Sequence, residues 1–200
     1  MKIFINIIYV LMLFFSILNA QLILPDQNIE NWKILYDDKI WIGWKNDGKI
    51  DWCRTKSVLN APMIKVRQII EDKVNYPQIF KRIETTNLIT EEIVYISLEM
   101  PFPFYDRDFV VKYIQIKEDS DFIYRFYSVV NDEAPLYSDY VRLIRATGEW
   151  RLKPLDSKHT EITYTWNGEL LGDFPNWALT RAWKQQGLEV INWIEEELVK

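Results

Sequence analysis

The stretch PNWALTRAWKQQGLEVINWIEEELVK (Pro175–Lys200) ends the chain and decides the fold that we expect. Its apolar residues recur three or four positions apart, which is the spacing that places one stripe along a helix. About 25 residues at 1.5 Å each give a helix about 37 Å long, and seven strands about 4.8 Å apart make a sheet about 34 Å wide. One helix can therefore cross a whole antiparallel sheet. The stripe consists of Leu179, Trp183, Gly187, Val190, Ile194 and Leu198.

The upstream sequence supplies strands for that sheet. A hairpin is predicted around Asn46-Asp47-Gly48, because these residues accept the positive backbone angles of a tight turn. Beyond Ile83 the hydrophobic period becomes two, and several strand candidates follow one another without a long helix between them. This pattern favours an α+β fold in which a curved antiparallel sheet of about seven strands packs on the terminal helix. The candidates are residues 32–36, 40–44, 50–59, 93–100, 107–117, 122–130, 140–152 and 160–170.

A shorter helix is expected between the third and fourth strands. Asn60 stands where a helix cap is wanted, and Pro62 falls in the first turn, where its missing N–H costs nothing. Met63, Val66, Ile70 and Val74 then share one stripe. The tripeptide Asn75-Tyr76-Pro77 is expected to end this helix, which we place at one end of the sheet.

The N-terminal segment reads as a leader. Residues 1–20 contain one lysine, an apolar run and a small residue, Ala20, before Gln21, which is typical of a secretory signal peptide. We therefore expect a mature domain of residues 21–200, secreted or periplasmic; the alternative is an uncleaved helix that anchors the protein in a membrane. Cys53 is the single cysteine, so no disulfide within the chain can form.

The composition narrows the range of partners. The formal net charge is −5, and removal of the leader with Lys2 would make it one unit more negative. An acidic chain without a basic block is a poor candidate for binding nucleic acid or anionic lipid. Nine Trp, eleven Tyr and ten Phe supply large, stiff rings that can line an apolar cavity.

Four segments, taken in order and spacing, give the sequence a family resemblance. They are PFPFYDRDFVV (101–111), YVRLIRATGEWRLKP (140–154), TEITYTWNGEL (160–170) and GDFPNWALTRAW (172–183). The more specific marks are Arg107-Asp108-Phe109 and Gly148 with Trp150 and Pro154. Together the segments resemble the steroidogenic-acute-regulatory-related lipid-transfer (START) family, within the wider Bet v 1-like group, over about residues 32–198.

The resemblance implies a helix-grip fold, in which the sheet wraps the C-terminal helix and encloses a cavity for one lipid or other hydrophobic ligand. It also implies that the loop at residues 131–139, with Pro135, Leu136 and Tyr137, gates the cavity together with Phe174 and Trp177. Strand alternation and the facing of the family then select the ligand-binding candidates. These are Val94, Ile96, Leu98, Phe109, Val111, Tyr113, Tyr164 and Trp166 from the sheet, with Trp177, Trp183 and Val190 from the helix.

The sequence departs from some sterol-binding members of this family at one place. Those members carry a buried pair, an acidic residue on the strand before the RDF motif and an arginine a few positions after it. Val94 and Tyr113 are the nearest equivalents here. The resemblance therefore does not support a sterol as the ligand.

The inventory of catalytic groups is thin. His159, the single histidine, lies in a polar turn, and Cys53 has no histidine near it in sequence to activate its thiol. The charged group Asp106-Arg107-Asp108 is expected to brace the entrance of a strand. We therefore expect a monomeric binding protein that makes transient membrane contact, without an enzymatic step, a cofactor or a metal. Two alternatives stay open: a cyclase- or hydrolase-type enzyme on the same fold, and an interaction module with a collapsed cavity.

Overall fold

The computed structural model describes residues 23–48 and 50–200. The expected signal peptide, residues 1–20, lies outside the described residues. Within the described part of the chain, no helix is both long enough and apolar enough to cross a membrane.

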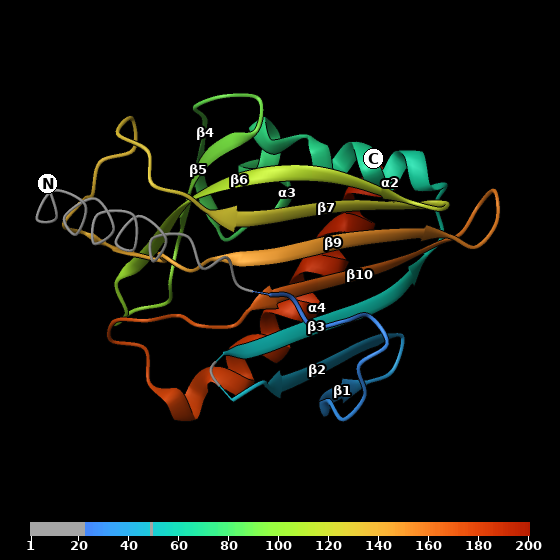
Figure 1. Ribbon diagram of the computed structural model, residues 1–200, viewed down its shortest axis with the longest axis horizontal. Helices are drawn as coiled ribbons and strands as arrows, with labels where there is room; N and C mark the ends of the chain where they lie inside the picture. Colours follow the sequence, from blue (N-terminus) through green and yellow to red (C-terminus); the bar gives the residue numbers. More distant parts are fainter. Residues whose placement is uncertain (1–22, 49) are drawn as a thin grey trace, which may run out of the picture.

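A single antiparallel sheet forms the body of the molecule (Figure 1). Along it the strands run in the order β1-β2-β3-β10-β9-β7-β6-β5-β4, and β8 adds a short parallel pairing to β6. Because β3 pairs with β10, the first hairpin of the chain joins the last strand. The strands are β1 Lys33–Asp37, β2 Ile40–Asn46, β3 Asp51–Leu59, β4 Ile83–Leu88, β5 Ile93–Leu98, β6 Asp106–Glu118, β7 Asp121–Ser128, β8 Tyr140–Arg142, β9 Thr147–Pro154 and β10 Thr160–Asn167.

The predicted α+β fold with an antiparallel sheet is confirmed, but about seven strands was too low a number. The edge strand β4 escaped prediction because its centre, Thr85-Thr86-Asn87, carries no apolar alternation. The segment expected as one strand over 140–152 is two strands, β8 and β9, separated by a turn.

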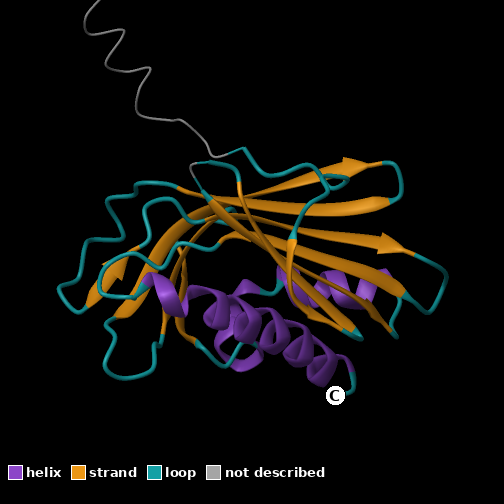
Figure 2. Ribbon diagram, turned by 90° about the horizontal axis from the view of Figure 1, so that it is seen from below, coloured by secondary structure: helices purple, strands orange, loops and turns teal. Residues whose placement is uncertain are grey.

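The helices lie together on one face of the sheet (Figure 2). The expected short helix is α2, but it begins after Pro62 without a side-chain cap, so the predicted cap at Asn60 was wrong. Asn75-Tyr76-Pro77 leads into a further helical turn instead of ending the run, because Pro77 is tolerated in the first turn of α3. The helices are α2 Met63–Glu71, η1 Lys73–Asn75, α3 Tyr76–Ile79, η2 Asn176–Ala178 and α4 Leu179–Leu198.

The long helix α4 packs mainly on β2 and β3, at one side of the concave face. Gly187 allows this close approach, because a Cβ at that position would lie 2.8 Å from Ile42 Cδ1. Ion pairs hold the exposed side of α4 to the rest of the fold: Lys39 bonds Glu195 at 2.7 Å, and Lys81 bonds Glu196 at 2.7 Å. From β2 and β3 the helix runs behind β10 and β9 toward α2 (Figure 1).

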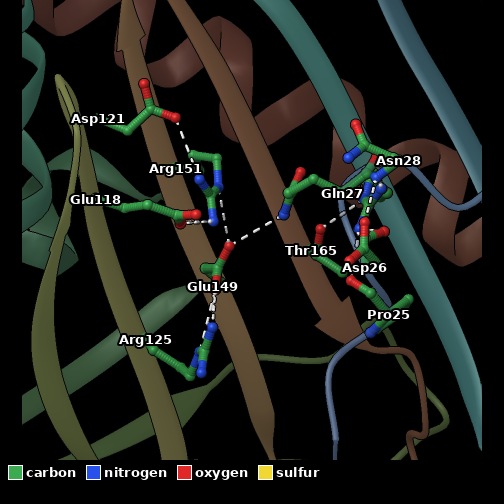
Figure 3. A network of polar contacts seen from close by, with 11 residues as sticks. Pro25, Asp26, Gln27, Asn28, Glu118, Asp121, Arg125, Glu149, Arg151 and Thr165 are labelled. Atoms are coloured by element: carbon green, nitrogen blue, oxygen red, sulfur yellow. Dashed lines mark hydrogen bonds and ion pairs between the residues drawn. The ribbon is translucent and has the colours of Figure 1, made fainter.

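The segment before β1 lies across the convex face, with Pro25, Asp26 and Gln27 beside Thr165 of β10 (Figure 3). Arg54 holds this segment in place. This fully buried arginine donates hydrogen bonds to the carbonyl oxygens of Pro25, Asp26 and Gln27 and, at 2.8 Å, to Thr165 Oγ1. Thr165 lies on the face of β10 that an alternating strand usually turns to water. It is buried here because residues 25–27 cover it.

Candidate functional site

A pocket of about 600 Å³ lies between the concave face of the sheet and α4. Side chains from β5, β6, β9 and β10 form its floor, and α3, α4 and the loops before β6 and α4 complete its wall. The wall is mostly apolar and rich in aromatic rings. The rings come from Tyr76, Phe80, Phe104, Phe109, Tyr113, Phe126, Trp150, Tyr164, Trp166, Phe174 and Trp193.

The structure brings most of the sequence-predicted ligand-binding residues together in this wall. Alternation along β5, β6 and β10 turns one side chain in two toward the concave face. The predicted residues that line the pocket are Ile96, Leu98, Phe109, Tyr113, Tyr164, Trp166 and Val190.

Four predicted residues lie outside the wall. Val94 and Val111 pair across β5 and β6 and are fully buried in the hydrophobic core beyond the pocket, with side chains of α2 and α3. Trp183 packs 5.2 Å from the Trp44 ring and donates from Nε1 to the carbonyl oxygen of Gly168 at 2.7 Å. Trp177, on η2, is 83% exposed. Periodicity predicted the face or the element on which each of these residues lies. It could not predict whether that part of the element borders the pocket.

Three stacked rings run along β9 and β10 at the floor of the pocket. The centroids of Trp150 and Tyr164, which are paired across the two strands, lie 3.9 Å apart at an interplanar angle of 16°. Tyr164 and Trp166 follow at 4.7 Å and 15°. Stacking on both faces holds the Tyr164 ring in one orientation.

Sequence reasoning missed Trp150, Phe126 and Phe104 as lining residues. Trp150 could have been found, because its alternation with Arg151 and Glu149 on β9 marks it as inward-facing. Phe104 lies in the loop between β5 and β6, where no period operates. Its ring lies 4.8 Å from that of Phe174, so the two rings join the loop before β6 to the loop before α4.

Two charged side chains of the wall, Arg82 and Glu169, form ion pairs with residues beside the pocket. Arg82 forms two bonds to Glu189, from Nε at 2.5 Å and from Nη2 at 2.8 Å. Burial alone would raise the pKa of Glu189, but hydrogen bonds from Arg82 and Gln185 and the charge of Arg82 outweigh it and lower this pKa. Glu169 is likewise paired with Arg145 at 2.8 Å.

The predicted gate residues of the loop at residues 131–139, Pro135, Leu136 and Tyr137, lie outside the pocket wall. Tyr137 packs on Tyr95, with centroids 6.2 Å apart, and Arg142 bonds the carbonyl oxygen of Pro135 at 3.0 Å. Tyr95 alternates with Ile96 along β5, so it projects from the convex face. Leu136 is 76% exposed. The loop therefore lies against the convex side of the sheet. Of the residues expected at the gate, Phe174 lies in the pocket wall, where it contacts Phe104.

The predicted brace at the entrance of β6 is present. Arg107 is fully buried and bonds the carbonyl oxygens of Leu170 and Leu171, each at 2.9 Å, and Asp173 Oδ1 at 3.0 Å. Asp108 forms a two-bond pair with Arg142, both at 2.8 Å. The Arg107 contacts fix the loop before α4 at the pocket, and the Asp108–Arg142 pair fixes the loop at residues 131–139 on the convex side.

The residues considered for chemistry lie away from this pocket. His159 is in the β9–β10 turn, where Asp156 accepts its Nδ1 contact at 2.8 Å. Cys53 is buried in the core, and this burial raises the pKa of its thiol. Among the described residues, no group of three or more His, Cys, Asp and Glu side chains is placed to hold a metal ion.

A second hollow of about 520 Å³ lies on the convex face beside residues 24–28. Its charged groups bond one another: Glu149 accepts from Arg125 at 2.6 Å and from Gln27 at 3.0 Å, and Arg151 reaches Asp121 at 3.2 Å (Figure 3). These bonds satisfy the groups within the fold, so the concave pocket is the candidate site for an apolar ligand.

Comparisons with known proteins agree with this architecture. The family model described as START domain matches residues 15–195. A STAR-related lipid transfer protein from Xanthomonas axonopodis is similar in structure, with 22% identity, a TM-score of 0.75, and coverage of 86% of this chain and 100% of that chain. Human STARD10 has 16% identity and a TM-score of 0.78 over 91% of this chain and 83% of that chain.

A curated relative adds a sequence match. It is an uncharacterized protein of Pseudomonas aeruginosa, 23% identical over 155 residues, which are 74% of this chain and 77% of the relative. The likeness to solved structures concerns the fold, whereas the family model spans most of the sequence. The chain therefore belongs to the START domain family.

Proposed function

We propose that this protein binds a lipid or another small hydrophobic molecule in the concave pocket. The observation that carries the proposal is the size and lining of this pocket: about 600 Å³, walled largely by aromatic side chains. Ligand sites in proteins are commonly concave, mostly apolar and about 300–1,000 Å³ in volume. Membership of the START family supports the same class of ligand.

The energetics suit a carrier. Burying about 12 CH₂ groups contributes about 10 kcal/mol at about 0.8 kcal/mol each. Association and immobilisation cost about 4 to 15 kcal/mol. Because the two terms are comparable, binding is reversible, and one chain supplies every wall of the pocket, so we propose that it acts as a monomer.

We further propose that the protein carries its ligand without a chemical step. Two charged side chains of the wall support this, because each is held in an ion pair: Arg82 with Glu189, and Glu169 with Arg145. A general acid or base needs an uncommitted group within hydrogen-bond reach of the substrate. A pocket of this volume also disfavours the alternative of an interaction module with a collapsed cavity.

Exposed apolar side chains beside the pocket support transient contact with a membrane. Phe102 is 97% exposed, two residues from Phe104, and Trp177 is 83% exposed, three residues from Phe174. Both belong to loops at the left end of the sheet in Figure 1. Tryptophan and phenylalanine at such positions partition into the bilayer interface.

We also propose export through cleavage after Ala20. The described fold supports a domain that starts close to this point, because Arg54 binds the carbonyl oxygens of residues 25–27. A cleaved chain would keep this contact. The mass of the protein recovered from the secreted or periplasmic fraction tests the proposal: loss of residues 1–20 supports it, and the full-length mass in a membrane fraction supports the uncleaved anchor.

Ligand uptake can be tested by fluorescence titration with N-phenyl-1-naphthylamine, an apolar dye that brightens when it leaves water. The binding proposal predicts saturable brightening with one dye per chain, reversed by a long-chain lipid. Brightening that never saturates, or none at all, would contradict it.

A further inference from the structure

The Tyr164 hydroxyl is a polar group of the pocket that no other part of the fold uses. The side chain is 9% exposed and lies in the pocket wall. Over residues 23–48 and 50–200 its hydroxyl has no hydrogen-bond partner. The Tyr164 oxygen is not fully enclosed by protein. It differs in this from Trp166 Nε1, which also has no partner but is fully buried. The remaining exposure of Tyr164 is therefore toward the pocket.

The fold prevents this hydroxyl from finding a partner elsewhere. The ring is stacked between Trp150 at 3.9 Å and Trp166 at 4.7 Å, so it cannot swing away without breaking both contacts. Tyr76, another tyrosine of the wall, differs because its hydroxyl donates a hydrogen bond to the carbonyl oxygen of Ile70 at 2.5 Å. Tyr164 therefore holds an uncommitted hydroxyl at a fixed place on the pocket floor.

The state of this hydroxyl determines what it can bind. Burial raises the pKa of Tyr164 well above its ordinary value, so the group keeps its proton and can donate. Its neighbours Trp150, Trp166 and Phe126 carry no charge that could balance an ionised ligand group. A buried donor without a partner costs free energy, which a ligand oxygen at this point would recover.

We propose that the ligand carries a neutral acceptor oxygen, such as the carbonyl of a ketone or an ester, and that Tyr164 Oη donates a hydrogen bond to it. This inference rests on the proposed function and narrows its ligand class from any apolar molecule to one with a carbonyl-type oxygen. A pure hydrocarbon would leave the Tyr164 hydroxyl buried without a partner.

The experiment compares Tyr164→Phe with the parent protein, using N-phenyl-1-naphthylamine as a probe without oxygen and tridecan-2-one as a competing ketone. We expect the variant to bind the oxygen-free dye at least as tightly as the parent does, because no hydroxyl is then buried without a partner, whereas the affinity for the ketone falls about 5- to 10-fold. Tyr36→Phe removes a hydroxyl outside the pocket wall and should change neither affinity.

The outcomes separate the two proposals. If the parent protein binds neither dye nor ketone, the proposed function fails. If both bind and Tyr164→Phe leaves the ketone affinity unchanged, the proposed function stands and the inference is overturned. Should the variant not fold, the infrared band of a ¹³C-carbonyl ketone bound to the parent protein decides: a shift to lower frequency than in alkane solvent supports the hydrogen bond, and an unshifted band overturns it.

Discussion

Arg107 and Asp173 form an ion pair, 3.0 Å from Nη2 to Oδ1, that ties the start of β6 to the loop before α4. Arg107 is fully buried, and its guanidinium also bonds the carbonyl oxygens of Leu170 and Leu171. The next residue, Phe174, contacts Phe104 in the pocket wall. A charged group outside the pocket thus positions one part of its apolar wall.

Arg107→Ala should strongly destabilise the fold. The change leaves two carbonyl oxygens without their donor and Asp173 without its partner, and losses of this kind cost about 3 kcal/mol. Urea unfolding followed by tryptophan fluorescence measures the free energy of unfolding. Arg145→Ala is the matched control, because its half-exposed pair with Glu169 is worth less than about 1 kcal/mol. Equal losses in the two variants would contradict the role assigned to Arg107.

Ala182→Phe should abolish ligand uptake while the protein stays folded. Ala182 lies on α4 in the pocket wall and is only partly buried by protein, so a larger side chain can extend into the empty volume. Titration with N-phenyl-1-naphthylamine gives the dye affinity, and the melting temperature gives the stability. Ile64→Phe, at an exposed position on α2, is the control and should bind as the parent does. Undiminished binding by Ala182→Phe would place the dye elsewhere.

The Arg82–Glu189 pair should make stability depend on pH in the acid range. The pKa of Glu189 is lowered in the folded state, so its contribution to stability is present above the unfolded-state pKa and is lost as the pH falls through the folded-state value. Parent and Glu189→Gln should therefore differ most near neutral pH, and the difference should shrink as the pH falls below the unfolded-state pKa of about 4.3. Urea unfolding across this pH range measures this difference. A gap that widens on acidification would show the opposite sign.

Phe102→Ala combined with Trp177→Ala should weaken binding to vesicles of neutral phosphatidylcholine. Their exposed rings supply apolar area next to the pocket, whereas the acidic chain has little attraction for anionic lipid. Cosedimentation with vesicles should show that partitioning falls about 10-fold. This corresponds to a loss of about 1.4 kcal/mol of binding free energy for the two rings together. Leu155→Ala, in the β9–β10 turn at the opposite end of the sheet, is the control. Equal partitioning of all variants would reject these loops as the contact.

Much of the fold could be predicted because it follows from periodicity. The stripe that includes Trp183, Gly187 and Val190 predicted α4, and the alternation of Ile162, Tyr164 and Trp166 predicted which face of β10 turns to the hydrophobic core. The edge strand β4 and the three-residue strand β8 gave no such signal, because their pairing depends on neighbours distant in sequence.

The site was harder to predict, because side chains on one face of a strand can either fill the core or border an empty volume, and periodicity does not distinguish the two. Periodicity assigns Val94 and Ile96 to one face of β5, yet only Ile96 lines the pocket, while Val94 is fully buried in the core beyond it. Loop positions carry no period at all. The contact of Phe104 with Phe174 and the placement of Tyr137 against Tyr95 therefore could be found only in three dimensions.

Native mass spectrometry of the protein purified without detergent tests the central claim most directly. A ligand held in the concave pocket predicts a mass above that of the polypeptide by one small molecule, which organic solvent extracts and which Ala182→Phe fails to retain. A bare polypeptide mass, together with no uptake when the protein is incubated with lipid, would contradict the binding function.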